Sequence, residues 1–435
     1  MRAFPLVLLA VLSVPALQPA QAQTAREVTL AEAIALAARH DPTVIQAEGG
    51  LRGADAGVRT AYSAFFPSIS GSASGGSSFS EGRDRVDPIT GEVISGDFTS
   101  KSASFGVSAG MDLFNGFRNT ADLRAARGRQ EQSEANLSNL RAQSARGTSL
   151  AFFAALQTRE LVRVREATVA RAQEQLTVAV ARLATRAATV QDSLRAVVQL
   201  GEARLALVSE LARLAADEAA LARRLGLEGR VVARDEGLAP TALELDTAQV
   251  LAEALSRAPS VLQADAAVRT SQASLAAARA SYFPTIRLSG NYNYSGSSST
   301  DYTFFNSRGV SLSVSVPLFQ GLGREEQMAT RGATLDADRA RAADARREVA
   351  ATLTAQFAAL DAARQRIALT QLSMQAAEAD VAVALARYRL GTLQSISDLN
   401  QAQSGLTNAQ QGAVVARFEY LRAKAEIEAI LGRPL

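Results

Sequence analysis

The chain has 435 residues, with 46 Lys and Arg residues against 43 Asp and Glu residues and a formal net charge of +3, so no basic surface that would bind nucleic acid is indicated. It has no cysteine and a single histidine, which excludes thiol chemistry and disfavours metal sites and histidine-based acid–base catalysis. Because no nucleophile–base set or phosphate-binding loop is recognisable either, we expect no cofactor and no enzymatic activity.

Residues 1–22 have the pattern of a secretory signal peptide. Arg2 provides the positive charge, Phe4 to Leu17 form a short apolar run, and Ala20-Gln21-Ala22 resembles a cleavage site, so the mature chain is expected to begin at Gln23. The run is too short and too interrupted by proline for a membrane anchor. No later stretch reaches about 18 apolar residues, so we expect no transmembrane helix in the mature chain.

The remainder is interpreted as one structural unit that occurs twice, over residues 23–226 and 248–435, joined by a connector at 227–247. The recurring motifs are Thr29–Ala33 and Val250–Ala254, Phe65–Pro67 and Tyr282–Pro284, Leu113–Gly116 and Leu318–Gly321, and Leu225–Gly226 and Leu431–Gly432. The first unit is longer mainly in its Gly-, Ser- and Asp-rich stretch Gly82 to Gly96, which is predicted to be a loop. Self-matching of alanine-rich sequence is the alternative, but it would not confine the length difference to a loop.

Each unit holds two segments in which apolar and polar residues alternate, at about 67–80 and 102–114, and at about 284–296 and 308–319. Alternation over nine or more residues predicts strands with one apolar and one polar face. Nine to eleven residues is also the length of a tilted transmembrane strand, and small polar residues opposite an apolar face are typical of outer-membrane barrels. A two-faced sheet outside a membrane is the alternative.

Two aromatic residues and a proline precede each strand pair. These are Phe65, Phe66 and Pro67, and Tyr282, Phe283 and Pro284. Aromatic residues are enriched where strands enter a membrane, and proline suits a change from helix to strand. We therefore expect these six residues to lie at the membrane interface and to form the swivel between helix and strand. Four strands cannot close a barrel, so the chain must oligomerise if the strands span a membrane. Two copies would supply eight strands and three would supply twelve.

The segments at about 117–183 and 324–390 contain no proline and favour helix. Each would be roughly 100 Å long at a rise of 1.5 Å per residue. Shorter helices are expected to return alongside them, with breaks at Pro42 and Pro259. One of these, from Leu207 to Leu225, has a heptad-like apolar seam that Glu218 interrupts. A carboxylate in such a seam needs a partner or a path to water.

This order of elements, occurring twice, resembles the TolC-like outer-membrane efflux protein family over essentially the whole mature chain. The resemblance implies a mainly α fold with transmembrane β: a homotrimer with a 12-stranded β-barrel in outer-membrane lipid, continued by a 12-helix α-barrel in the periplasm. It also implies docking to a periplasmic adaptor protein and to an inner-membrane efflux pump or ABC transporter. The alternative, a periplasmic coiled-coil adaptor or structural spacer without a pore, would need only one helical hairpin and no strand pairs suited to lipid.

The resemblance places a periplasmic gate at the helical tip. Asp398 matches the family's tip aspartate and Asp192 its counterpart in the first unit, whereas Gln401 replaces a second aspartate and Leu393 a gate-linking arginine. The expected gate residues are Asp192, Asp398, Thr185, Arg186, Gly391 and Gln401. Thr185 lies where the second unit has glycine, so a positive φ in this turn would be strained. The aspartates could form a ring that attracts cations, cap the following helices, or do both.

Overall fold

The structure is a computed structural model that describes residues 26–86, 89–237, 246–298, 303–390, 396–433 and 435. The expected signal peptide and Gly391 lie outside the described residues, as does part of the connector. The described residues form two compact units: a sheet unit within Pro42–Arg146, Ala242–Ala362 and Ala423–Leu435, and a tip unit within Met1–Asp41, Gly147–Thr241 and Ala363–Arg422. No described helix has a stretch long and apolar enough to cross a membrane.

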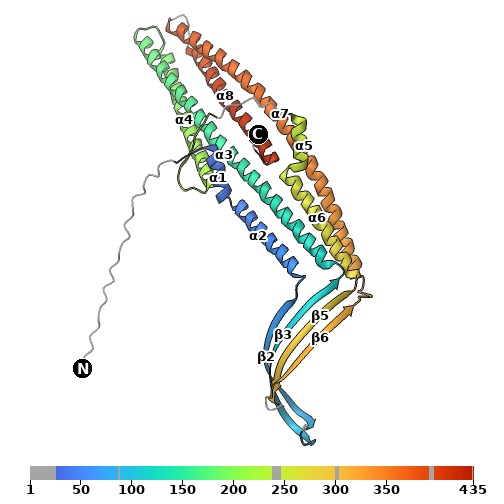
Figure 1. Cartoon of the computed structure of the whole chain (residues 1–435). Helices are drawn as coiled ribbons and strands as arrows, with labels where there is room; N and C mark the ends of the chain where they lie inside the picture. Colours follow the sequence, from blue (N-terminus) through green and yellow to red (C-terminus); the bar gives the residue numbers. More distant parts are fainter. Residues whose placement is uncertain (1–25, 87–88, 238–245, 299–302, 391–395, 434) are drawn as a thin grey trace, which may run out of the picture. The chain divides into compact units, whose positions relative to one another are not determined.

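Four antiparallel strands form the sheet of the sheet unit, in the order β2-β3-β5-β6 (Figure 1). Their bounds are β2 Ser68–Val86, β3 Val93–Asn115, β5 Thr285–Ser297 and β6 Phe305–Ser315. β2 and β5 begin directly after Pro67 and Pro284, since proline has no N–H for the ladder of hydrogen bonds. Among the described strands, β2 and β6 each pair on one side alone, so the sheet has two open edges.

The loop expected from Gly82 to Gly96 is too long, because β2 continues to Val86 and β3 already begins at Val93. Val86 pairs with Val93, and a register shift between Ser80 and Arg83 takes up Gly82, which has a φ of 65°. The stretch is too polar to alternate, so its sequence resembles a loop. The partner strand nevertheless satisfies its backbone groups.

The expected strand at 308–319 is also displaced, since β6 starts at Phe305 and ends at Ser315. Pro317 cannot donate a hydrogen bond to a ladder. Instead, the guanidinium of Arg324 donates to the carbonyl oxygens of Pro317 and Leu318, at 3.0 and 3.2 Å. These side-chain contacts replace strand pairing where the chain turns into a helix.

Each strand pair leads into a long helix through two residues in the left-handed region. Gly116 and Phe117 have φ values of 66° and 65°, and Gly321 and Leu322 have values of 59° and 66°. A Cβ on Gly116 would lie 2.6 Å from the carbonyl oxygen of Ala280, so a larger residue does not fit. The helices that follow are α3, Arg118–Ala184, and α7, Gly323–Arg389, against the expected 117–183 and 324–390.

In the sheet unit, helices α2 (Pro42–Ser63) and α6 (Pro259–Arg279) pack with the first parts of α3 and α7. Ion pairs mark the neighbours: Glu48 with Arg141 at 2.7 Å, Glu131 with Arg269 at 2.6 Å, and Asp265 with Arg346 at 2.7 Å. The helices therefore follow the order α2-α3-α6-α7, which matches the order of the strands. Such exposed pairs fix the register more than they stabilise the fold.

In the tip unit, α4 (Val190–Leu225), the end of α3, α8 (Ile396–Leu431) and the end of α7 lie in that order. Ala172 of α3 packs on Leu200 of α4, and Ala179 of α3 lies in one cluster with Leu399 of α8. An ion pair joins Arg366 of α7 to Glu419 of α8. Small side chains at these contacts allow close helix approach.

The connector also contains structure that the sequence did not predict. Its segment β4 (Val231–Ala233) pairs in parallel with β1 (Arg26–Val28), next to helix α1 (Leu30–His40). Later in the chain, α5 (Thr247–Arg257) begins with Asp246 as its N-cap. Strands of three residues are too short to produce a recognisable alternation.

Glu218 of α4 finds the partners that its buried position requires. Its side chain is fully buried, and its two oxygens accept from Arg159 at 2.7 Å and Arg230 at 2.5 Å. Arg159 also donates to the carbonyl oxygen of Ala233 at 2.5 Å. A buried carboxylate thus fixes α3, α4 and the small β1–β4 sheet together.

Candidate functional site

The strand register gives the sheet one polar face. Ser108 lies between Ser70 and Asn291, and Ser289 lies opposite Ser311. Hydrogen bonds of 2.8 Å join the hydroxyls of Ser70 and Ser108, and those of Ser289 and Ser311. Small hydroxyl and amide side chains therefore form a continuous hydrophilic surface across all four strands.

The opposite face carries exposed apolar side chains. Val310 is 82% exposed and Leu312 is 63% exposed, and Ile69, Val107 and Val314 are exposed as well. An apolar band that spans a sheet is unusual on a surface in water and marks contact with lipid or with another protein. One polar and one apolar face are what a membrane barrel requires.

The predicted interface residues lie where helices lead into β2 and β5. The ring of Tyr62 is 6.1 Å from that of Phe65 and 6.2 Å from that of Phe66. At the second junction, the guanidinium of Arg324 lies 4.7 Å from the ring centre of Tyr282. The four predicted aromatic side chains, Phe65, Phe66, Tyr282 and Phe283, are all exposed.

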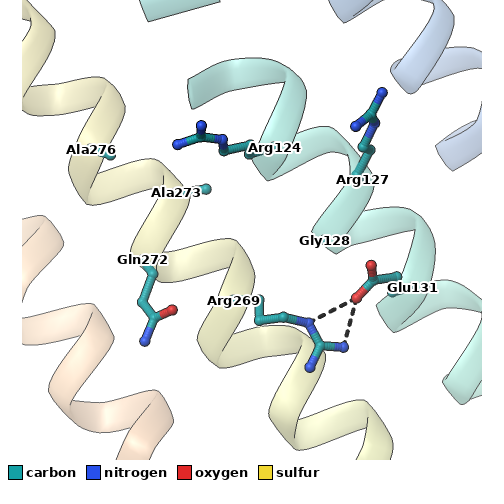
Figure 2. Close-up of a pocket in the computed structure, with 8 residues that line it drawn as sticks. All are labelled: Arg124, Arg127, Gly128, Glu131, Arg269, Gln272, Ala273 and Ala276. Carbon is teal, nitrogen blue, oxygen red and sulfur yellow. Dashed lines mark hydrogen bonds and ion pairs between the residues drawn. The ribbon is translucent and has the colours of Figure 1, made fainter. Parts of the chain in front are cut away.

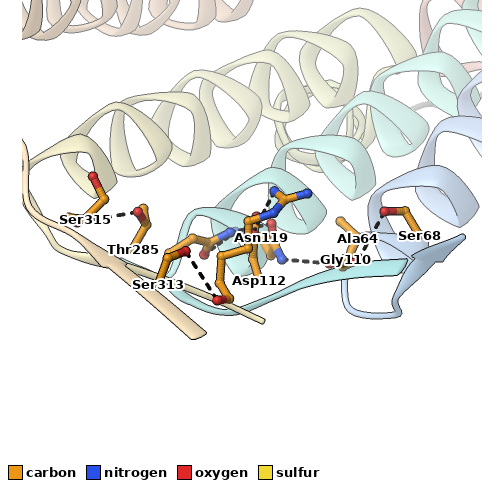
Figure 3. A network of polar contacts seen from close by, with 10 residues as sticks. Ala64, Ser68, Gly110, Asp112, Asn119, Thr285, Ser313 and Ser315 are labelled. Carbon is orange, nitrogen blue, oxygen red and sulfur yellow. Dashed lines mark hydrogen bonds and ion pairs between the residues drawn. The ribbon is translucent and has the colours of Figure 1, made fainter. Parts of the chain in front are cut away.

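A polar network occupies the end of the sheet nearest these junctions (Figure 3). Arg287 donates to Asp112 at 3.1 Å, and the hydroxyl of Ser313 donates to the carbonyl oxygen of Arg287 at 3.4 Å. Asn119 donates to the carbonyl oxygen of Ala64 at 2.9 Å, which ties α3 to the end of α2. A cavity of about 370 Å³ lies beside Asp112.

A second hollow of about 400 Å³ lies between α3 and α6 (Figure 2). Three arginines line it, but Arg269 is paired with Glu131, while Arg124 and Arg127 point in different directions. The two helices approach closely at Gly128, since a Cβ there would lie 2.5 Å from the hydroxyl oxygen of Thr270. The arginines do not converge on one point, so this hollow is not a candidate anion site.

At the tip, α4 begins with a capping box. The hydroxyl of Thr189 accepts from the backbone N–H of Asp192 at 3.2 Å, and Asp192 accepts from the N–H of Thr189 at 3.1 Å. Asp192 therefore takes part in capping as the third helical residue, while Thr189 is the N-cap. Its carboxylate is used to secure the start of the helix.

Arg182 joins the turn between α3 and α4 to the end of α7. It donates to the carbonyl oxygens of Tyr388 at 2.6 Å and Ala187 at 3.0 Å, and its guanidinium lies 4.5 Å from the ring centre of Tyr388. Burial raises the pKa of Tyr388, and the charge of Arg182 opposes that rise. These two residues line a hollow of about 210 Å³ together with Arg186 and Asp192.

The other predicted gate residues have different surroundings. Thr185 and Arg186 lie in the turn, and Arg186 has a φ of 59°, the strained conformation that the missing glycine implies. Asp398 and Gln401 are exposed on α8 and do not line the hollow of Arg182. Gly391 lies outside the described residues.

Sequence reasoning missed Arg182 and Tyr388 as the residues that organise the tip. A signal was present, because these two are separated by the same number of residues as Asp192 and Asp398. They therefore occupy matching positions in the two sequence units. Matching positions do not by themselves show a contact, so the cation–π interaction of Arg182 with Tyr388 becomes evident only in the structure.

The two-faced sheet, the row of long helices and the tip define the class of outer-membrane channel proteins. A model of the outer membrane efflux protein family matches residues 33–227 and 250–433, and the chain belongs to this family. The expected family resemblance is thereby confirmed.

Individual relatives agree with this assignment. Protein CyaE of Bordetella pertussis is 27% identical over 412 residues, which is 94% of this chain and 84% of CyaE. The outer membrane efflux protein BepC of Brucella suis is 24% identical over 94% of this chain and 87% of BepC. The solved structure of the outer membrane protein VceC from Vibrio cholerae has the same fold, with a TM-score of 0.78 at 18% identity, over 93% of this chain and 96% of VceC.

Proposed function

We propose that the chain is the channel subunit of an efflux or secretion system in the cell outer membrane, and that it extends into the periplasm. The observation that carries this proposal is the sheet, whose apolar face suits lipid and whose polar face suits a water-filled pore. A periplasmic adaptor or spacer without a pore would not need an exposed apolar sheet face. Residues 1–22 would direct export as a cleaved signal peptide.

The open edges of the sheet support assembly with further copies of the chain. Open strand edges are not tolerated in lipid, so β2 of one copy would pair with β6 of the next. A head-to-tail contact of this kind generates a closed ring when the rotation between copies closes. Three copies would supply twelve strands for a barrel and twelve helices for a continuing helical tunnel.

Helices α4 and α7, which lie at the two ends of the helix row in the tip unit, also support a contact between neighbouring copies of the chain. Each presents exposed apolar side chains at helical spacing along one face. On α4 these are Val190, Leu194, Val197, Val198, Leu205 and Val208, and on α7 they are Leu369, Leu372 and Val383. We call them the α4 stripe and the α7 stripe. Packing of one stripe on the other in the next copy would bury both.

We further propose an internal two-fold repeat within each protomer. The same order of elements occurs twice, namely two short helices, two strands, a helix of 67 residues and a helix of 36 residues. Family membership supports docking to a periplasmic adaptor and an inner-membrane efflux pump or ABC transporter. No nucleic-acid partner and no catalytic role are proposed.

The gate at the tip is proposed to rest on Asp398 more than on Asp192. Asp192 is committed to the capping box, whereas Asp398 is exposed in the first turn of α8. Three copies of Asp398 around a constriction would attract cations. Asp398→Asn is therefore expected to weaken the block of single-channel current by added divalent cations. An unchanged block would leave Asp398 with a role in the helix alone.

The hairpin of β2 and β3 offers a direct test of the proposed placement. Its turn includes Ile89, which is 92% exposed, and Gly91, which has a positive φ. An epitope inserted after Thr90 is expected to bind antibody on intact cells, because this end of the sheet would face the exterior. Antibody binding only after permeabilisation would contradict that placement. An epitope between Ala187 and Ala188 is the matched control and should require permeabilisation.

A further inference from the structure

The charged residues on the polar face of the sheet lie at one position along the strands. On this face, four successive rows of paired residues cross β3, β5 and β6, and each such row is called a rung. These rungs are Asp112–Arg287–Ser313, Gly110–Ser289–Ser311, Ser108–Asn291–Gly309 and Gly106–Asn293–Ser307. Within these four rungs Asp112 and Arg287 are the only charged residues. They lie at the end of the sheet next to the helices.

Arg287 lies across the neighbouring strand and does not extend away from the sheet. Its Nη1 is 3.1 Å from Asp112 Oδ1, and a Cβ on Gly110 would lie 3.0 Å from its Nη2. Glycine at position 110 therefore leaves space for the guanidinium. The side chain of Arg287 remains 54% exposed and that of Asp112 37% exposed, so both charges act on solvent at this face.

The described residues that line the cavity beside this rung carry more positive than negative charge. The cavity beside Asp112 is also lined by Arg118 and Arg324. Asp112 is the one acidic residue among the described residues that line it. Arg324 is held in place by its bonds to the carbonyl oxygens of Pro317 and Leu318. Three arginines thus lie around one carboxylate at this level.

We propose that the Asp112–Arg287 rung, with Arg118 and Arg324 beside it, is a charge filter at the sheet end of the pore, separate from Asp398 at the tip, and favours anionic groups of a passing solute. Arg287 supplies the positive potential on the polar face, and Asp112 moderates it and holds the guanidinium over Gly110. The inference rests on the proposed function, since it requires that the polar face lines the pore. In an assembled ring the rung recurs once per copy, and rings of charge set selectivity in channels.

The absence of native cysteine allows the potential at the rung to be measured directly. Ser313→Cys places one thiol opposite Arg287 in the register. Its reaction rates are compared for two methanethiosulfonate reagents, one with a sulfonate and one with a quaternary ammonium group. The ratio of the two rates reports local potential, because changes in thiol reactivity affect both reagents equally. The measurement uses the full chain in lipid vesicles, and each reagent is tested alone.

Neutralising Arg287 and neutralising Asp112 should shift this ratio of reaction rates in opposite directions. In Arg287→Gln the sulfonate reagent should react about threefold more slowly and the ammonium reagent about threefold faster, as expected for one charge about 7 Å away in water. Asp112→Asn should produce the reverse. An unchanged ratio in both variants, or a shift in the same direction in both, would overturn the proposed filter.

Two further cysteine variants distinguish a failure of the proposed charge filter from a failure of the proposed channel function. Ser104→Cys lies on the same face but roughly 27 Å along β3, beyond the screening length, so its ratio should not respond to either variant. An unaltered rate there also shows that the variants remain folded. Leu312→Cys lies on the apolar face and should be protected from both reagents by lipid. Rapid reaction at Leu312→Cys would contradict the proposed channel itself, whatever the ratio at Ser313→Cys.

Discussion

Glu218→Ala is expected to release the β1–β4 sheet from the helices of the tip unit. Glu218 is fully buried and is the acidic partner of Arg159, whose side chain is only 21% exposed. Removing it leaves Arg159 without its counter-charge, which costs about 3 kcal/mol when one member of a buried pair is deleted. Arg230 can turn to water, because its side chain is 62% exposed.

Amide hydrogen exchange in the β1–β4 sheet measures this loss of stability where it should be largest. The N–H of Arg26 donates to the carbonyl oxygen of Arg230 at 3.2 Å, and the N–H of Arg234 donates to that of Val28 at 2.9 Å. Both amides should exchange roughly 100-fold faster in Glu218→Ala, since 1.4 kcal/mol corresponds to a factor of ten. The matched control is Glu160→Ala, which removes the pair with Arg163, whose side chain is 66% exposed. That control should cost at most about 1 kcal/mol. Equal exchange rates in the two variants would show that the buried pair does not hold the small sheet.

Val198→Asp and Leu372→Asp are each expected to abolish the oligomer. The two side chains are 59% and 64% exposed in a single chain, so a carboxylate there leaves the protomer intact. In the proposed ring they would be buried between the α4 stripe and the α7 stripe. Burial of one such side chain is worth about 1.5–3 kcal/mol, and an unpaired carboxylate in its place costs more. The loss recurs at every interface of the ring.

Crosslinking of the protein in membranes tests these variants, with Glu378→Arg as the control. Glu378 is exposed on α7 and, at 3.6 residues per turn, lies more than about 100° around the helix from every residue of the α7 stripe, so its charge reversal should leave the crosslinked species unchanged. The two stripe variants should yield monomer, with the circular dichroism of the helices retained. Oligomers of normal yield in both stripe variants would show that these faces are not the contact between copies.

Features with a local periodic signal could be predicted from the sequence. The long helices could be predicted because about 66 residues pass without proline, and the strand pairs because residues such as Val310, Leu312 and Val314 alternate with serine. In both cases the signal lies within the segment itself. The strained turn at Arg186 was predicted from a comparison of the two units, because Thr185 lies where the second unit has Gly391.

Features that depend on distant partners could not be predicted. The β2–β3 hairpin extends through a polar stretch because the opposite strand satisfies its backbone, and no residue of that stretch indicates this alone. The same holds for β4, which needs β1 from the start of the chain. Glu218 was recognised as a problem in an apolar seam, but its partners Arg159 and Arg230 became identifiable only in three dimensions.

The particle mass of the full chain, purified from membranes in a mild detergent and measured by native mass spectrometry, tests the central claim most directly. One chain has a mass of 45.7 kDa before any cleavage. The account predicts a single species of three mature chains, the number that the family resemblance implies, in which the sheet edges and the helix row would close into one ring. A particle of one chain, in which strands β2 and β6 would remain unpaired, would contradict the account. A particle of two chains, which would supply only eight strands, would contradict it as well.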